Sequence, residues 1–123
     1  MVIFQLNIFV NHIILLYKID FFFNYLIMIT FNPDAPFTYC KHSRIYQQRF
    51  PLTSVYEISI IYGELTQSND KECFEIALLK DRKRLYLTEY DTVEGYVTPE
   101  RINDFIKLVQ TTKDENEILQ YFR

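Results

Sequence analysis

Hydrophobic and polar residues alternate along two stretches in the middle of the chain, residues 55–62 and 73–80. Successive side chains of a β-strand point to opposite faces, so each stretch predicts a strand with one apolar face and one mixed face. A charged run at residues 81–83 predicts a tight turn, and residues 84–88 predict a third strand with two leucines on the apolar face. We therefore expect a three-stranded antiparallel meander.

A helical spacing replaces the alternation after Thr98. Thr98 suits the N-cap position and Pro99 suits the first position of a helix. Four apolar residues then recur at the i, i+3, i+4, i+7 spacing of a helical stripe: Ile102, Phe105, Ile106 and Val109. This pattern predicts one C-terminal helix that covers the apolar face of the sheet. A second short terminal helix is predicted from Lys113, with Thr112 as its cap.

These elements predict an α+β fold whose folded domain spans residues 54–123. A domain of this size buries a small fraction of its surface, so additional burial is needed. Three sources are open: the terminal helix, residues 37–50, or a second copy of the chain as a homodimer.

Residues 32–53 contain three prolines and predict a connector. Two alternatives remain for its conformation. Residues 37–46 suit a short edge strand, whereas Ser43 suits the cap of a helical turn that runs to Phe50.

Residues 1–31 form a hydrophobic leader in which twenty-three side chains are apolar or aromatic. A membrane span is disfavoured because Lys18 and Asp20 each cost about 2.5–3.5 kcal/mol at mid-helix, which cancels the gain from the apolar residues. The residue types are those of AT-rich codons, and our hypothesis is that translation starts at Met28 or further in. A membrane or interfacial segment and a soluble helix or strand are the alternatives.

Candidate catalytic and metal-binding residues are few. The two cysteines, Cys40 and Cys73, are expected to be free thiols in a reducing cytoplasm. His42 follows Cys40 in a Cys-x-His pattern that lacks the other two ligands of a zinc site. Only two glycines occur, which excludes glycine-rich phosphate-binding loops. We expect no enzyme activity, no cofactor and no metal.

Aromatic residues are abundant, with ten tyrosines and eleven phenylalanines. Three tyrosines lie on or near the mixed face of the predicted sheet and its loops: Tyr86, Tyr90 and Tyr96. Exposed tyrosines are favoured at interfaces because they bury a large area at a low entropic cost. We therefore take these three as candidate partner-binding residues.

Basic residues provide a second candidate surface. Arg82, Lys83 and Arg84 follow one another at the predicted turn, and together with Arg44 they are candidate phosphate-binding residues. A basic and aromatic stretch upstream suits base stacking and phosphate contacts with a single strand, or else amphipathic cover over the sheet: Tyr39, Lys41, Arg44, Tyr46, Arg49 and Phe50. The net charge of −3 gives no global attraction to nucleic acid.

Three segments carry a resemblance to known proteins: YEISIIYG at residues 56–63, FEIALL at 74–79 and DTVEGYVT at 91–98 before a helix. In this order they resemble small uncharacterised proteins of Gram-positive phages and other mobile elements, over residues 55–109. The resemblance implies an accessory role in AT-rich bacteria or their phages. It implies no reaction and no functional residue.

The function expected from the sequence is a small, non-enzymatic, cytoplasmic accessory protein that binds another protein. One alternative is a nucleic-acid-binding protein that uses the basic turn. Another is a membrane-tethered protein, which requires residues 1–31 to be translated.

Overall fold

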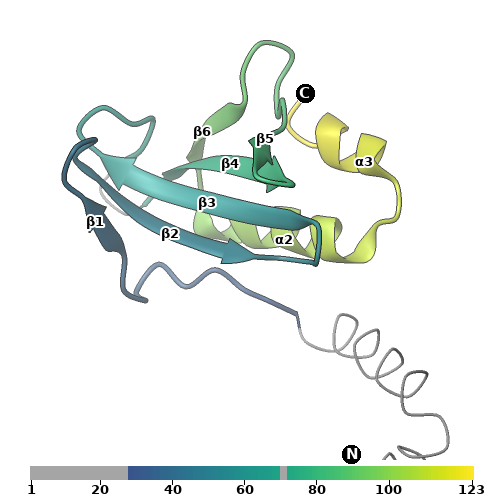
Figure 1. Ribbon diagram of the computed structural model, residues 1–123, viewed down its shortest axis with the longest axis horizontal. Coiled ribbons are helices and arrows are strands. Elements are labelled where there is room, and N and C mark those ends of the chain that lie inside the picture. Colours follow the sequence, from purple (N-terminus) through teal and green to yellow (C-terminus); the bar gives the residue numbers. More distant parts are fainter. Residues whose placement is uncertain (1–27, 70–71) are drawn as a thin grey trace, which may run out of the picture.

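The computed structural model describes residues 28–69 and 72–123, and this part of the chain forms an α+β fold with six strands and two helices (Figure 1). The strands are β1 (Thr38–Cys40), β2 (Ile45–Pro51), β3 (Tyr56–Gly63), β4 (Phe74–Lys80), β5 (Lys83–Arg84) and β6 (Val93–Val97). The helices are α2 (Pro99–Thr111) and α3 (Glu115–Gln120).

All the strands pair antiparallel in one sheet, in the order β1-β2-β3-β4-β5, and β6 also pairs with β4. The prediction of three strands is therefore wrong, while the α+β class and the antiparallel pairing are confirmed. Two of the additional strands, β1 and β2, lie in the segment interpreted as a connector. The structure shows strand there and no helical turn that runs to Phe50, but as a hairpin that turns at residues 41–44 in place of the single edge strand suggested for residues 37–46.

The predicted third strand at residues 84–88 is largely replaced by a turn. Only β5 pairs there, and the backbone N–H groups of Leu87 and Thr88 both donate to the carbonyl of Asp91. The chain then returns as β6, which pairs with β4 from Phe74 to Ala77. The edge of β4 that does not pair with β3 is therefore divided between two short strands, β5 and β6. Leu87 is nevertheless fully buried, as its place in the apolar pattern predicts.

The first helix begins where the sequence predicts. Thr98 is the N-cap and its side chain accepts a hydrogen bond from the Arg101 N–H, with Pro99 at the first position. The second helix begins later than predicted, at Glu115, with Asp114 as the cap in place of Thr112. The Asp114 carboxylate accepts from the Asn116 N–H, and the Thr112 hydroxyl accepts from the Asp114 N–H instead.

The core joins side chains from the strands and from α2. The four residues of the helical stripe are all buried and belong to one cluster with residues of β3, β4 and β6. Members of this cluster from the sheet are Ile58, Ile60, Phe74, Ile76, Leu78 and Val97. Figure 1 shows α2 lying along the sheet, with α3 beyond its end.

Residues 29–31 also belong to the folded unit. Phe31 is 3% exposed and its ring packs edge-on against that of Phe74, with centroids 5.0 Å apart. Gln110 on α2 accepts a hydrogen bond from the Ile29 N–H and donates one to the Leu52 carbonyl, each at 3.0 Å. An extended segment is therefore attached to the helix through side-chain amides.

The hydrophobic leader lies outside the described residues, apart from residues 28–31. Within residues 28–69 and 72–123, neither helix is long and apolar enough to cross a membrane.

Candidate binding surfaces

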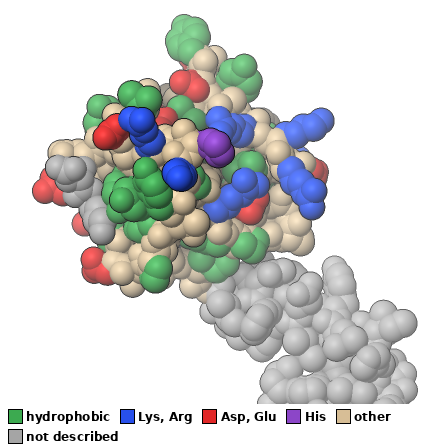
Figure 2. Space-filling model, turned by 60° about the vertical axis from the view of Figure 1, so that its left-hand side comes forward, with side chains coloured by type: hydrophobic (Ala, Val, Ile, Leu, Met, Phe, Trp, Pro, Cys, Tyr) green, Lys and Arg blue, Asp and Glu red, His purple; other side chains and the backbone are tan. Residues whose placement is uncertain are grey.

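The hairpin of β1 and β2 forms one edge of the sheet, and we call residues 38–51 the basic edge. Residues 35–56 contain no Asp or Glu and carry Lys41, Arg44 and Arg49, in a chain whose net charge is −3. The turn residues 41–44 are all exposed. Figure 2 shows lysine and arginine side chains gathered around a histidine on this side of the molecule.

The turn of the basic edge holds Arg44 in an unusual backbone conformation. Its φ is 56°, in the left-handed region that costs most residues about 1–2 kcal/mol. The Arg44 N–H donates to the Cys40 carbonyl at 2.8 Å, which closes the turn. Its guanidinium lies 3.8 Å from Glu64, and both side chains are more than 70% exposed. An exposed pair of this kind contributes little, so the guanidinium remains available to a ligand.

A row of three contacting tyrosine rings crosses the first three strands. Tyr39 pairs with Tyr46, and Tyr46 pairs with Tyr62, in the registers of the two hairpins. The ring centroids are 4.8 Å apart in both pairs; the planes of Tyr46 and Tyr62 differ by 9°, whereas those of Tyr39 and Tyr46 are tilted by 46°. Tyr39 is 50% exposed and Tyr46 is 39% exposed. The sequence places both tyrosines in one stretch, but only the strand register brings their rings together.

A shallow groove of about 600 Å³ lies between the turn of the basic edge and the loop after β3. Its lining combines polar and apolar side chains: His42, Ser43, Arg44, Ile45, Ile61, Leu65, Thr66 and Glu75. Burial raises the pKa of the Glu75 carboxyl, and the charge of Asp91 adds to the effect, while a backbone hydrogen bond at Gln67 and the charge of Arg84 oppose it. The groove thus offers cationic, hydroxyl and aliphatic contacts around one poorly solvated acid.

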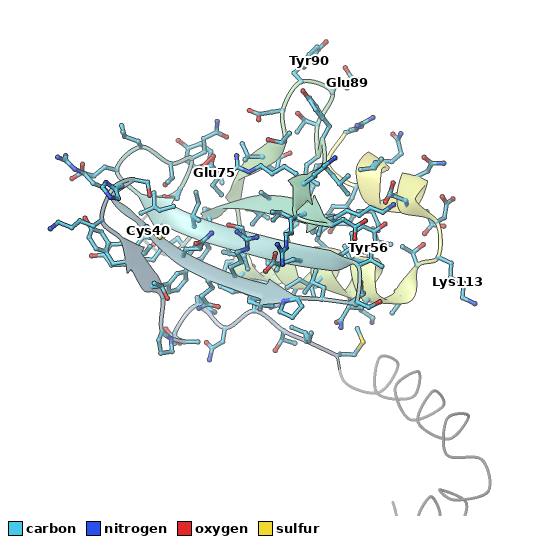
Figure 3. All side chains as sticks on the ribbon, in the orientation of Figure 1. Cys40, Tyr56, Glu75, Glu89, Tyr90 and Lys113 are labelled. Carbon is cyan, nitrogen blue, oxygen red and sulfur yellow. The ribbon has the colours of Figure 1, made fainter. Side chains whose placement is uncertain are left out.

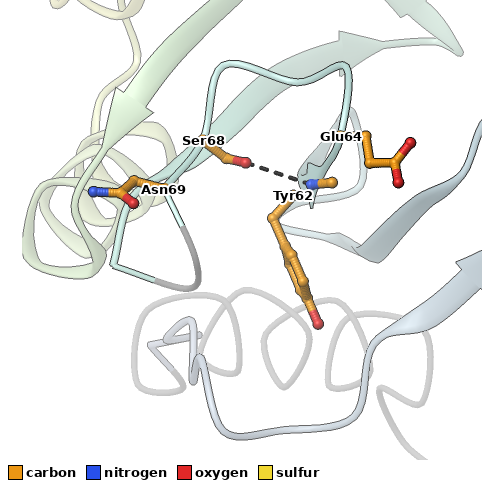
Figure 4. Close-up of a pocket in the computed structure, with 5 residues that line it drawn as sticks. Tyr62, Glu64, Ser68 and Asn69 are labelled. Atoms are coloured by element: carbon orange, nitrogen blue, oxygen red, sulfur yellow. Dashed lines mark hydrogen bonds between the residues drawn. The ribbon is translucent and has the colours of Figure 1, made fainter.

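A smaller pocket of about 310 Å³ lies on the other side of the same loop (Figure 4). The hydroxyl of its lining serine, Ser68, is used within the loop. The Ser68 hydroxyl accepts from the Gly63 N–H at 3.4 Å, and it lies 2.6 Å from the Thr66 hydroxyl. Thr66 also donates to the Gly63 carbonyl at 2.7 Å. These hydrogen bonds hold the loop in contact with the end of β3.

The opposite side of the sheet bears the three candidate partner-binding tyrosines, and we call residues 85–97 the tyrosine edge. Tyr86, Tyr90 and Tyr96 are 57%, 89% and 63% exposed. Figure 3 shows Tyr90 and Glu89 at the tip of the loop that joins β5 to β6, both directed away from the sheet. The segment contains Glu89, Asp91 and Glu94 and no Lys or Arg.

The three tyrosines lie along one segment without stacking on one another. Tyr86 and Tyr90 belong to the loop, whereas Tyr96 lies on β6, where its N–H donates to the Gln67 carbonyl at 2.8 Å. The φ of Tyr96 is 52°, another left-handed conformation. This arrangement of the three tyrosines suits an extended contact surface better than a pocket.

The four candidate phosphate-binding residues do not form one cluster. Arg82, Lys83 and Arg84 lie at the β4–β5 turn, beside the start of β3, whereas Arg44 lies beside its end. An eight-residue strand spans about 23 Å, which separates the two groups. Acidic residues lie near the β4–β5 turn, since the charge of Arg82 acts on Glu57 and that of Arg84 on Glu75.

Two other pairs of charged side chains form structural contacts. Arg49 donates to Glu57 at 2.8 Å, and the Lys80 ammonium donates to Glu115 at 2.8 Å. Tyr56 also donates to Glu115, so this carboxylate ties α3 to β3 and β4. Among the described residues, no group of three or more His, Cys, Asp or Glu side chains is arranged to hold a metal ion, and both cysteines are free thiols.

No protein-family model, curated protein or solved structure matches this chain. The surfaces themselves are therefore the basis for inferring what the protein binds.

Proposed function

We propose that the protein is a non-enzymatic accessory protein that binds another protein through the tyrosine edge. In this proposal α2 covers one face of the sheet, and the partner contacts the tyrosine edge together with the adjoining open face. The observation that supports it is the exposure of three tyrosines along an edge segment that contains acidic residues and no basic ones.

The composition of this edge resembles that of a protein interface. A tyrosine supplies a large contact area with only two side-chain torsions to order, and it is enriched among residues that dominate binding energy. Glu89, Asp91 and Glu94 lie in the same segment as these tyrosines. Acidic residues of this kind favour a basic surface on the partner and speed its association.

The backbone at Tyr96 supports the same proposal. A left-handed φ is adopted more readily by Gly or Asn than by Tyr, so a tyrosine here costs about 1–2 kcal/mol of stability. Such costs are often retained at binding sites. The resemblance of residues 55–109 to small proteins of phages and mobile elements also supports an accessory role.

Affinity capture with the full chain as bait tests the proposal. The variant Tyr86→Ala/Tyr90→Ala/Tyr96→Asn removes the three rings, and Asn suits the left-handed position. We expect wild-type bait to retain one protein in stoichiometric amount and the triple variant to lose it.

The matched control is Tyr39→Ala/Tyr46→Ala, which removes two exposed tyrosines from the basic edge and should retain the partner. Circular dichroism checks that both variants are folded. The absence of a stoichiometric partner, or its equal retention by the triple variant, would show that the tyrosine edge is not the binding surface.

A further inference from the structure

We propose that the basic edge binds single-stranded nucleic acid, with a base stacked on Tyr39, which Tyr46 supports, and phosphates held by Lys41 and Arg44. This site is separate from the tyrosine edge and goes beyond the proposed protein binding. It combines the two features that proteins use to bind single strands without strong sequence preference, aromatic stacking surfaces and cationic side chains along the backbone path.

The tyrosine rings provide the stacking surface. Tyr39 and Tyr46 keep half and about two fifths of their surface exposed although their rings are in contact. Tyr46 lies between the other two rings, parallel to Tyr62 and tilted by 46° against Tyr39, each 4.8 Å away, so it orients Tyr39 and leaves the outer face of Tyr39 for a base. A ring that is already oriented loses little entropy when a base stacks on it, which favours binding.

The local charge provides the attraction. The 22-residue stretch 35–56 has three basic residues and no acidic residue, so the basic edge is cationic within an acidic chain. Arg49 is engaged by Glu57 at 2.8 Å, which leaves the turn residues as the available cations. Lys41 and Arg44 are exposed, and the weak pair of Arg44 with Glu64 is broken at little cost.

The geometry of the turn places these cations beside the rings. Lys41 directly follows Cys40 at the end of β1, and Arg44 directly precedes Ile45 at the start of β2. Tyr39 and Tyr46 are each two residues from one of the two cations, on paired positions of the same hairpin. His42, exposed between them, adds a ring nitrogen donor to the same turn.

The β4–β5 turn is the weaker candidate for this role. It carries Arg82, Lys83 and Arg84, but Glu57 and Glu75 lie close enough to act on these charges. The nearest candidate tyrosine, Tyr86, lies in a segment with three acidic residues. Since Glu57 and Glu75 also lie beside Arg49 and Arg44, the difference between the two sites is the pair of contacting tyrosine rings at the basic edge.

Fluorescence anisotropy of the full-length chain with labelled oligo(dT) and oligo(rU) of about 12 nucleotides tests the proposal, with a DNA duplex of equal length for comparison. We expect both single strands to bind at low salt and more tightly than the duplex. Tyr39→Ala/Tyr46→Ala should weaken binding by at least about fivefold, since one stacked base contributes at least about 1 kcal/mol. Tyr39→Phe/Tyr46→Phe keeps the stacking surface and should restore binding.

The salt dependence tests the phosphate contacts separately. Lys41→Gln/Arg44→Gln should lower the slope of log K against log salt by about 1.4, because each phosphate contact on a single strand contributes about 0.7. The matched control is Tyr86→Ala/Tyr90→Ala/Tyr96→Asn on the tyrosine edge, which should leave oligonucleotide binding unchanged. The same control loses the protein partner under the proposed function, so the two proposals fail independently.

Three results would overturn this inference. One is the absence of oligonucleotide binding at low salt by a folded protein. Another is binding that the alanine variants at Tyr39 and Tyr46 leave unchanged. The third is concentration-dependent self-association that these variants abolish while no oligonucleotide binds, which would assign the basic edge to a second copy of the chain.

Discussion

The side-chain amide of Asn103 forms hydrogen bonds with both backbone groups of Phe31. Its oxygen accepts from the Phe31 N–H at 2.6 Å, and its nitrogen donates to the Phe31 carbonyl at 3.2 Å. The two residues are 72 positions apart in the chain. This contact fixes the segment that precedes β1 on α2, and through Phe31 it completes the core.

Replacing Asn103 by Ala should therefore destabilise the fold. The backbone N–H and carbonyl of Phe31 lose their partners, which costs about 1–3 kcal/mol of the free energy of unfolding. Urea unfolding followed by circular dichroism measures the change. Asn116→Ala, on the exposed side of α3, serves as the matched control, and an equal effect of the two substitutions would contradict a specific role for Asn103.

Gly63→Ala should destabilise the junction between β3 and the turn of the basic edge. Gly63 has a φ of 150°, and a Cβ built there would lie 2.7 Å from the carbonyl oxygen of Arg44. The positive φ and the close contact both disfavour a side chain at this position. We expect a loss of about 1–3 kcal/mol in the free energy of unfolding. Thermal unfolding measures it, with Ser54→Ala at the exposed turn before the other end of β3 as the comparison. Wild-type stability of the alanine variant would show that the backbone shifts freely at this junction.

Protonation of the Glu115 carboxylate should lower the stability of the fold under acidic conditions. Its pKa is lowered from 4.5, first by the hydrogen bond from Lys80 and then by that from Tyr56. A group whose pKa is lower in the folded state contributes stability above its unfolded pKa and loses it as the pH falls through the folded pKa. The pair is partly exposed, so the contribution is about 1 kcal/mol or less.

Glu115→Gln should consequently be less stable than the wild type near neutral pH, with the difference shrinking below pH 4.5. Unfolding in urea across this range measures the difference. Glu117→Gln on the same helix is the control. A difference that stays constant with pH would exclude a contribution from the ionised carboxylate.

Tyr56 should produce a separate loss of stability at alkaline pH. Burial, together with the hydrogen bond to Glu115, raises its pKa from 10.0 to about 12. The stability that this neutral phenol contributes is complete below pH 10.0 and is lost as the pH approaches 12. Tyr56→Phe should show a smaller decline over that window in urea unfolding. An identical decline in the two proteins would place the alkaline transition elsewhere.

The elements that the sequence predicts well are those with a strong local pattern. Residues 55–62 and 73–80 alternate clearly because β3 and β4 are central strands with one face in the core. The helix after Thr98 combines a cap, a proline and a regular stripe. In each case the information lies within ten or so residues.

The missed elements depend on partners far away in the chain. β2 contains Gln47 and Gln48 between its apolar residues, because the Gln48 side chain bonds backbone carbonyls at Asn32 and Ala35. β6 contains Gly95, where a Cβ would lie 2.3 Å from the Cβ of Gln67 in another loop. Neither strand shows a clean alternation, and no local signal predicts either contact.

For the candidate surfaces, the residue types are predictable from the sequence, whereas their arrangement in space is not. The exposed tyrosines and the basic turn are visible as residue types, so they are predicted from the sequence. The contact between the rings of Tyr39 and Tyr46 depends on the register of a hairpin whose first strand has three residues. The separation of Arg44 from Arg82 likewise depends on which ends of β3 the two turns adjoin.

The division of one side of β4 between β5 and β6 limits how molecules of this protein join into fibrils. Templated fibril growth requires a long, unbroken row of unpaired backbone groups on a flat outer strand. Here that side presents two residues, then a protruding loop, then five residues with a register shift against β4. Each interruption shortens the row, so this side of the sheet is a poor template for amyloid growth.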